Sequence, residues 1–138
     1  MSGQAIDCPF CERIRDARGA RPFATARAFA DEFPVSRGHT LVVPVRHEAD
    51  FFALSVAEQT DVLSLVSEVR AELSETLQPD GFNIGINAGP AAGQTVGHAH
   101  VHVIPRFDGD VPDPRGGIRW VLPERAAYWP RDTTGGVG

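Results

Sequence analysis

The hydrophobic positions of residues 56–77 predict a long helix. Apolar side chains recur here every three or four residues, which is the spacing of one helical face. They are Val62, Leu65, Val66, Val69, Leu73 and Leu77. Ser55 and Glu58 have the spacing of a capping box, in which each side chain accepts a backbone N–H at the start of a helix. A Pro-Asp-Gly run at 79–81 ends the pattern, so we expect one helix with a single face against a core.

Alternating apolar and polar positions predict strands on both sides of this helix. Four segments are compatible with strands: residues 23–33, 41–45, 82–88 and 98–104. Pro44 has no backbone N–H, so it indicates either a sheet edge or the end of a strand. A glycine-rich loop at 89–97 separates the last two segments. We therefore expect the α+β class, with an antiparallel meander of about five strands and one long helix.

The two ends of the chain have a different character. A short N-terminal helix is predicted from Cys8 to Arg15, ended by Gly19. Residues 108–132 are rich in proline and glycine but carry apolar side chains, so we expect an extended tail that packs on the body. Residues 133–138 are expected to be disordered.

Length and composition narrow the protein class. The 138 residues are predicted to form a single domain with its core at about 8–107. A formal net charge of −5 argues against general affinity for nucleic acid or for anionic membranes. No apolar run approaches the roughly 18–20 residues of a membrane span, and the first residues lack a signal-peptide pattern, so we expect a cytoplasmic protein. The chain has no lysine, which excludes lysine nucleophiles and Schiff bases.

Three of the five histidines occupy alternate positions, at His98, His100 and His102. On a regular strand their imidazoles would project from one face, about 6.5–7 Å apart. Metal binding is one explanation, because imidazole is a common metal ligand. Nucleophilic or acid–base catalysis is the other, because imidazole titrates near neutral pH. The upstream loop at 87–95 has no acidic residue and offers amide, hydroxyl and backbone donors, which favours phosphoryl or nucleotidyl transfer.

Residues 97–104, Gly-His-Ala-His-Val-His-Val-Ile, resemble the His-φ-His-φ-His-φ-φ signature of the histidine triad (HIT) family, where φ is an apolar residue. Residues 38–44 with His47 are similar to a second signature of that family. Asn87 followed by Gly-Gln-Thr-Val at 93–96 is similar to a third. These segments follow the family's order and approximate spacing, so a HIT-like fold is expected.

The resemblance implies a hydrolase that acts through a nucleotidyl-histidine intermediate. His100 would attack the α-phosphorus of a purine nucleoside phosphoramidate or a diadenosine polyphosphate, and water would then release the nucleoside monophosphate. The carbonyl of His98 would hold the tautomer of His100. The residues implied to bind substrate are Asp31, which would hold the ribose hydroxyls, His39, Asn87, Gln94, Thr95 and His102. Phe10, Phe29 and Phe33 are candidates for the nucleobase slot, with core packing as the alternative.

Cys8 and Cys11 form a C-x-x-C pair. A redox pair, two free buried thiols and a metal site are all open on the residues alone, although only seven residues precede the pair, too few for the strand that precedes a redox motif. The resemblance implies a structural zinc held by Cys8, Cys11, His47 and His98.

Other functions remain open. A histidine at position 102 favours a hydrolase over the transferase branch, where glutamine is typical. A nucleotide-binding or scaffold module with negligible turnover, a nucleotidyltransferase, and a metalloenzyme using the three histidines are the alternatives. Arg106, Arg115 and Arg119 are either contacts for a second phosphate or solvated tail residues. The resemblance also implies a homodimer formed through the long helix and a central strand, although the apolar stripe of the helix could equally serve a monomer core.

Overall fold

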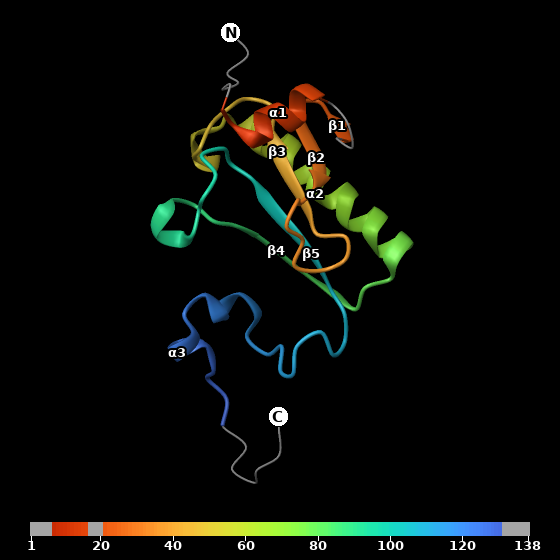
Figure 1. Ribbon diagram of the computed structural model, residues 1–138, viewed down its shortest axis with the longest axis vertical. Coiled ribbons are helices and arrows are strands. Elements are labelled where there is room, and N and C mark those ends of the chain that lie inside the picture. Colours follow the sequence, from red (N-terminus) through yellow and green to blue (C-terminus); the bar gives the residue numbers. More distant parts are fainter. Residues whose placement is uncertain (1–6, 17–20, 131–138) are drawn as a thin grey trace.

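The computed structural model describes residues 7–16 and 21–130 and places five antiparallel strands in one sheet, in the order β1-β2-β3-β5-β4 (Figure 1). The strands are β1 (Arg21–Phe23), β2 (Ala26–Ala30), β3 (Thr40–Pro44), β4 (Gly81–Ile86) and β5 (Val101–Arg106). The α-helices are α1 (Pro9–Asp16), α2 (Val56–Leu77) and α3 (Pro123–Ala126). Short 3-10 helices are η1 (Phe51–Ala53), η2 (Pro90–Ala92) and η3 (Gly117–Val121). The α+β class is confirmed.

The two faces of the sheet carry different helices. Helix α2 covers one face and packs against inward side chains such as Val42 and Val101 (Figure 1). Helix α1 contributes Ile14 to a second core cluster, with Leu41 among its members. Successive side chains of a strand point to opposite faces, and paired residues share a face. His102 pairs with Leu41 and therefore lies on the α1 face, away from α2.

Helix α2 begins and packs as its sequence predicts. The Ser55 hydroxyl accepts the backbone N–H of Glu58 at 3.1 Å, and the Glu58 carboxylate accepts that of Ser55 at 3.0 Å. The apolar stripe faces the sheet: Val62, Leu65, Val66 and Val69 are buried, and Leu73 is partly buried against the same cluster. The stripe thus serves the core of this chain.

Two strand predictions differ in detail from the structure, and the prediction for Pro44 is met in one of its two forms. The segment 23–33 is divided into β1 and β2 by a tight turn in which Ala24 has a φ of +47°. Pro44 is the last residue of β3, so it marks a strand end inside the sheet. The sheet is also not a simple meander. The crossover through α2 leads from β3 to the edge strand β4, and β5 then returns between β3 and β4.

The histidine segment is only partly a strand. Strand β5 begins at Val101, so His98 and His100 precede it and only His102 lies in the ladder. The apolar residues that alternate with the histidines are buried: Ala99, Val101 and Val103.

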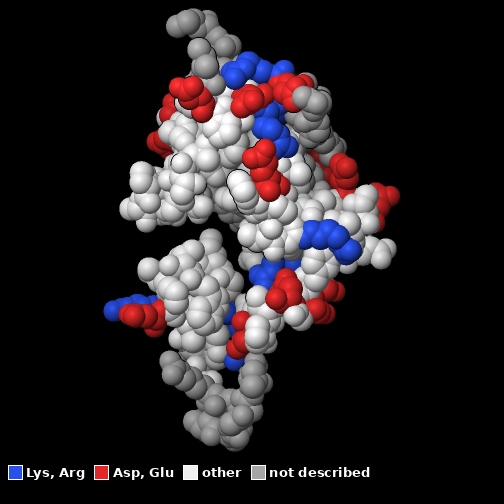
Figure 2. Space-filling model, viewed as in Figure 1, with Lys and Arg blue, Asp and Glu red and all other residues white. Residues whose placement is uncertain are grey.

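The tail forms a small lobe of its own. Its Trp120 indole donates to the main-chain oxygen of Arg115 at 2.6 Å, and Arg119 donates to that of Ala126 at 2.9 Å. Four of its apolar side chains are 65–74% exposed: Ile118, Val121, Leu122 and Tyr128. The lobe also approaches β4, where a Cβ added at Gly85 would lie 3.9 Å from Ile118. Figure 2 shows a hollow between this lobe and the body. Residues 133–138 and Gly19 lie outside the described residues. No helix in the described ranges is long and apolar enough to span a membrane.

Candidate active site and metal-binding cluster

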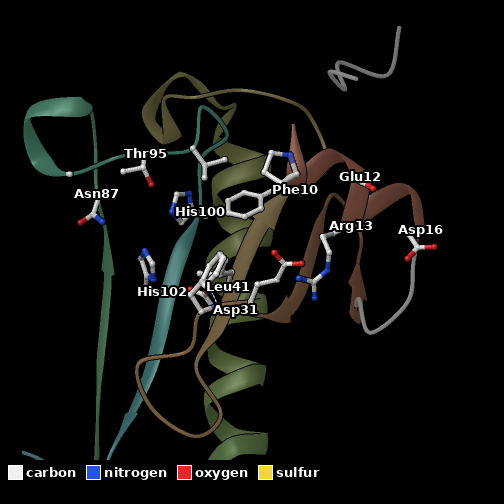
Figure 3. Close-up of a pocket in the computed structure, with 15 residues that line it drawn as sticks. Phe10, Glu12, Arg13, Asp16, Asp31, Leu41, Asn87, Thr95, His100 and His102 are labelled. Carbon is white, nitrogen blue, oxygen red and sulfur yellow. Dashed lines mark hydrogen bonds between the residues drawn. The ribbon is translucent and has the colours of Figure 1, made fainter. Parts of the chain in front are cut away.

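A pocket of about 670 Å³ lies on the α1 face of the sheet. Figure 3 shows how its labelled residues are arranged: Asn87 and Thr95 at one end, His100 and His102 in the middle, and Glu12, Arg13 and Asp16 of α1 at the other end. The loop between β4 and β5 supplies the first end, and the N-terminal helix supplies the last. The pocket therefore joins the two conspicuous sequence motifs, the histidine segment and the C-x-x-C helix.

The backbone sets the tautomer of His100. Its Nδ1 lies 2.8 Å from the main-chain oxygen of His98, as the resemblance implied. A carbonyl oxygen only accepts, so Nδ1 carries the proton and Nε2 keeps its lone pair. The ring of Phe10 packs edge-on against the imidazole, with centroids 5.0 Å apart. His100 is 7% exposed and lines the pocket, so Nε2 is the ring nitrogen left available to a bound molecule.

His102 belongs to a chain of hydrogen bonds that starts at the backbone. The N–H of Val35 donates to Nδ1 of His39 at 3.1 Å, so Nε2 of His39 carries the proton. This Nε2 lies 2.9 Å from Nδ1 of His102 and 3.3 Å from a carboxylate oxygen of Asp31. Nδ1 of His102 then accepts, and its Nε2–H is a donor at the pocket wall. Burial lowers the pKa of both histidines, which keeps them neutral near pH 7.

The distances among Asp31, His39 and His102 are short enough for a metal ion. The hydrogen bonds favour another use. Nδ1 of His39 already accepts the N–H of Val35, so its Nε2 holds a proton and offers no lone pair to a cation. Nor do the three triad histidines converge on one point, because His98 points its Nδ1 at the cysteines and His100 donates to a carbonyl. The metalloenzyme alternative finds no ligand set among the described residues of this pocket.

The structure separates the other predicted site residues into two groups. Asp31, Asn87 and Thr95 line the pocket. Gln94 instead braces the loop, because its side-chain oxygen accepts from the N–H of Gly89 at 2.9 Å and its amide donates to the main-chain oxygen of Ala49 at 2.8 Å. A contact between Gln94 and a phosphate would require these bonds to be exchanged.

Of the aromatic candidates for a base slot, Phe10 and Phe33 line the pocket and Phe29 is buried beneath it. Sequence reasoning missed several lining residues: Glu12, Arg13, Asp16, Glu32 and Leu41. A signal for those on α1 was present. Phe10 and Arg13 are three residues apart, so they share a helical face, while the buried Cys11 and Ile14 define the face against the sheet.

A second cluster contains Cys8, Cys11, His47 and His98. Nδ1 of His98 lies 3.5 Å from each cysteine sulfur and 3.3 Å from Nδ1 of His47. Nδ1 of His47 lies 3.4 Å from the sulfur of Cys11. Around a tetrahedral zinc, with Zn–S of about 2.3 Å and Zn–N of about 2.0–2.1 Å, neighbouring ligand atoms are about 3.3–3.8 Å apart. The four side chains are therefore positioned to bind a metal ion.

The protein also orients these ligands. Nε2 of His98 lies 2.8 Å from the main-chain oxygen of Pro44, so Nε2 holds the proton and Nδ1 directs its lone pair at the thiols. Burial lowers the pKa of His98 to about 4, and the ring stays neutral as a ligand must. The sulfur of Cys8 accepts the backbone N–H of Cys11 at 3.4 Å, at the first turn of α1. The cluster thus ties α1 to the end of β3.

Comparisons with known proteins agree on one family. A family model described as the HIT domain matches residues 23–109. The adenosine 5'-monophosphoramidase hnt1 of Schizosaccharomyces pombe is 36% identical over 104 residues, covering 73% of this chain and 75% of that protein. A bis(5'-nucleosyl)-tetraphosphatase of the same organism is 40% identical over 83 residues, covering 60% and 46%. The crystal structure of a Zn-bound histidine triad family protein from Mycobacterium smegmatis is 34% identical, with a TM-score of 0.69 and coverage of 76% and 78%.

Proposed function

The chain belongs to the HIT domain family, and we propose that it is a nucleotidyl hydrolase that reacts at the α-phosphorus of a purine nucleotide. One observation carries this proposal. The hydrogen bond from Nδ1 of His100 to the carbonyl of His98 leaves an unprotonated Nε2 at the centre of a pocket large enough for a nucleotide. The relatives named as a phosphoramidase and a tetraphosphatase both act on nucleotides, which supports the substrate class.

The reaction proceeds in two displacements. Nε2 of His100 attacks phosphorus and forms an N–P bond, while the bond to the leaving group breaks and the leaving group takes its electron pair and a proton from solvent water. A second water then attacks the phosphorus and releases a proton to solvent, the N–P bond breaks, and its electron pair returns to Nε2 as the nucleoside monophosphate leaves. The positive charge that develops on the imidazole is stabilised by the carbonyl of His98, which accepts the Nδ1–H throughout.

The remaining lining residues fit the parts of a nucleotide. The Nε2–H of His102, the hydroxyl of Thr95 and the amide of Asn87 are donors for the phosphate oxygens. The carboxylate of Asp31 is the acceptor for the ribose hydroxyls. Phe10 and the apolar side chain of Leu41 supply surfaces for the base. His39 and Gln94 act indirectly, the first through His102 and the second by holding the loop.

The leaving group is proposed to be an amine, which makes the substrate a nucleoside phosphoramidate. A polyphosphate leaving group needs cations, and the tail arginines are engaged elsewhere. Arg106 pairs with Asp110 at 2.8 Å, Arg115 pairs with Asp113 at 2.9 Å, and Arg119 donates to tail carbonyls. In the described part of the pocket wall, the end formed by the loop after β4 has no cationic side chain.

We propose that the metal of the second cluster is zinc and that its role is structural. Two sulfur and two nitrogen donors are the set that zinc prefers, and four protein ligands leave no open position for substrate. When bound, zinc supplies a cross-link between α1 and the sheet. The chain's own residues then hold the α1 wall of the pocket against His100, through Phe10.

A homodimer in the cytoplasm completes the proposal. Strand β4 is an edge of the sheet, and its Ile84 is 44% exposed, so this edge is open to a second copy. Light scattering on the purified protein tests the oligomeric state, and a monomer at micromolar concentration would contradict it. The reducing cytoplasm keeps two cysteine ligands as thiolates rather than as a disulfide.

The decisive experiment is a turnover assay with the full chain and with His100→Ala. Adenosine 5'-phosphoramidate and diadenosine tetraphosphate are offered separately, and AMP release is followed. We expect AMP from wild type, faster from the phosphoramidate, and none from the variant. Unchanged metal content and AMP binding in His100→Ala serve as the folding control. AMP release by the variant would overturn the nucleophile. A wild type that binds AMP without turnover would establish a binding module instead.

A further inference from the structure

The nucleoside end of the pocket contains one arginine with unused donors. Arg13 projects from α1 and lines the pocket, next to the proposed base slot (Figure 3). Its guanidinium carbon lies 4.4 Å above the centre of the Phe29 ring, which is itself 2% exposed. Within the described part of the chain, no carboxylate or carbonyl takes up its N–H groups. An arginine held by its face therefore keeps the edge of its fork for a ligand.

Carboxylates line the same end of the pocket. Glu12 lies beside Arg13 on α1, and Glu32 follows Asp31 on the opposite wall. Both are exposed, and their carboxylate oxygens can accept hydrogen bonds. A base in this slot thus meets a planar pair of donors and separate acceptors, rather than apolar walls alone.

The two purines differ in what they offer to such a slot. Guanine has two adjacent acceptors, O6 and N7, and donors at N1 and N2, whereas adenine places an amino donor next to N7. An arginine fork binds O6 and N7 of guanine with two parallel hydrogen bonds. Facing adenine, one arm of the same fork would meet the N6 amino group, donor against donor. Carboxylates complement the N1–H and N2–H groups of guanine.

We propose that Arg13 makes this pocket selective for guanine nucleotides, by binding O6 and N7 of the base while the ribose lies at Asp31. Glu12 and Glu32 supply acceptors for the opposite edge of the base. Base recognition rests on the proposed function, because a nucleotide must occupy the pocket. Recognition by Arg13 would add selectivity for the base, which neither the catalytic histidine nor the phosphate contacts can provide.

Calorimetric titration of the full, metal-containing protein with GMP, IMP and AMP tests the choice. IMP is the informative probe, because it has O6, N7 and N1–H but lacks the N2 amino group. We expect GMP to bind about tenfold more tightly than AMP, with IMP closer to GMP. Arg13→Leu should bring all three affinities together by weakening GMP and IMP. Arg13→Lys keeps the charge but loses the fork, so it too should lose most of the discrimination.

Arg15→Leu is the matched control, because Arg15 lies on the same helix outside the pocket wall. It should leave the GMP-to-AMP ratio unchanged. Equal binding of GMP and AMP by wild type, or equal weakening of all three ligands by Arg13→Leu, overturns base selection while the hydrolase proposal stands. Failure of every nucleotide to bind overturns both. Turnover of guanosine and adenosine 5'-phosphoramidates provides the second readout and should show the same ratio in kcat/KM.

Discussion

The Nε2 atom of His39 lies 2.9 Å from Nδ1 of His102, although His39 is buried behind the pocket wall. The backbone N–H of Val35 decides the direction of this hydrogen bond, because it occupies the other nitrogen of His39. A main-chain group four residues before His39 thereby determines that His102 offers a donor to the pocket. His100 is set in the same way by the carbonyl of His98. Both tautomers in the proposed reaction are therefore fixed by backbone geometry.

His39→Ala should lower turnover, although His39 itself does not contact the substrate in the proposed complex. Nδ1 of His102 would lose its donor, and the ring could turn or change tautomer, so the phosphate would lose a hydrogen bond. A loss of about 1–3 kcal/mol corresponds to a fall in kcat/KM of about 5- to 150-fold. His39→Gln retains an N–H donor and should recover part of the loss. Full activity in His39→Ala, with metal content unchanged, would show that His102 holds its orientation without this partner.

The free energy of unfolding should decrease in mildly acidic solution because of His39 and His102. Burial lowers the pKa of His39 and His102 below the ordinary value of 6.5, so the unfolded chain takes up protons before the folded one does. The free energy of unfolding is then independent of these groups above pH 6.5 and decreases as the pH falls below it. Urea titrations at pH 7.5 and 5.5, with metal content checked at both, measure the difference. The double variant His39→Gln/His102→Asn should show a smaller difference, and an equal one would assign the effect to other groups.

The sequence predicts the long helix and the faces of the strands because these depend on local periodicity. The capping box at Ser55 and the buried stripe of α2 are confirmed in the structure. The order of the strands in the sheet depends on contacts between segments that are far apart in the sequence. A hydrophobic pattern does not say which neighbour a strand pairs with, so the insertion of β5 between β3 and β4 was not predicted. The break at Ala24 was also missed, because alanine is not a turn residue and its positive φ is imposed by the tight connection between β1 and β2.

The candidate site was predicted only as far as its motifs extend. The family resemblance brought together His98 and the cysteines, and the structure places all of them within ligand distance. Arg13 lies in no signature, and its position follows from the docking of α1 across the sheet, which is a tertiary contact. Gln94 illustrates the opposite limit, since a signature residue close to the histidines in sequence turns out to bond to its own loop.

Removing one ligand of the metal cluster should loosen α1. Cys8→Ser leaves a weaker ligand, so we expect the zinc content of the purified protein to fall well below one per chain. A loss of about 3 kcal/mol would lower the melting temperature by about 10 °C. A strong chelator should reproduce this shift in wild type and change the variant much less. Unaltered zinc content and melting temperature in Cys8→Ser would refute the metal site and leave the cysteines as buried thiols.

Gly38 lies in the loop before β3 and packs against the end of α2, so it should not accept a side chain. Its φ is +90°, a region that alanine rarely adopts, and an added Cβ would lie 2.5 Å from Cδ1 of Leu77 and 3.2 Å from Pro105. Gly38→Ala should therefore reduce the free energy of unfolding by about 2 kcal/mol or more. It should also displace the adjacent His39, so kcat/KM should fall even below the melting temperature. Gly81→Ala is the control, because nothing lies within 4 Å of its added Cβ and its φ is not positive. Equal unfolding midpoints for the two variants in urea would show that α2 and the loop can move apart without cost.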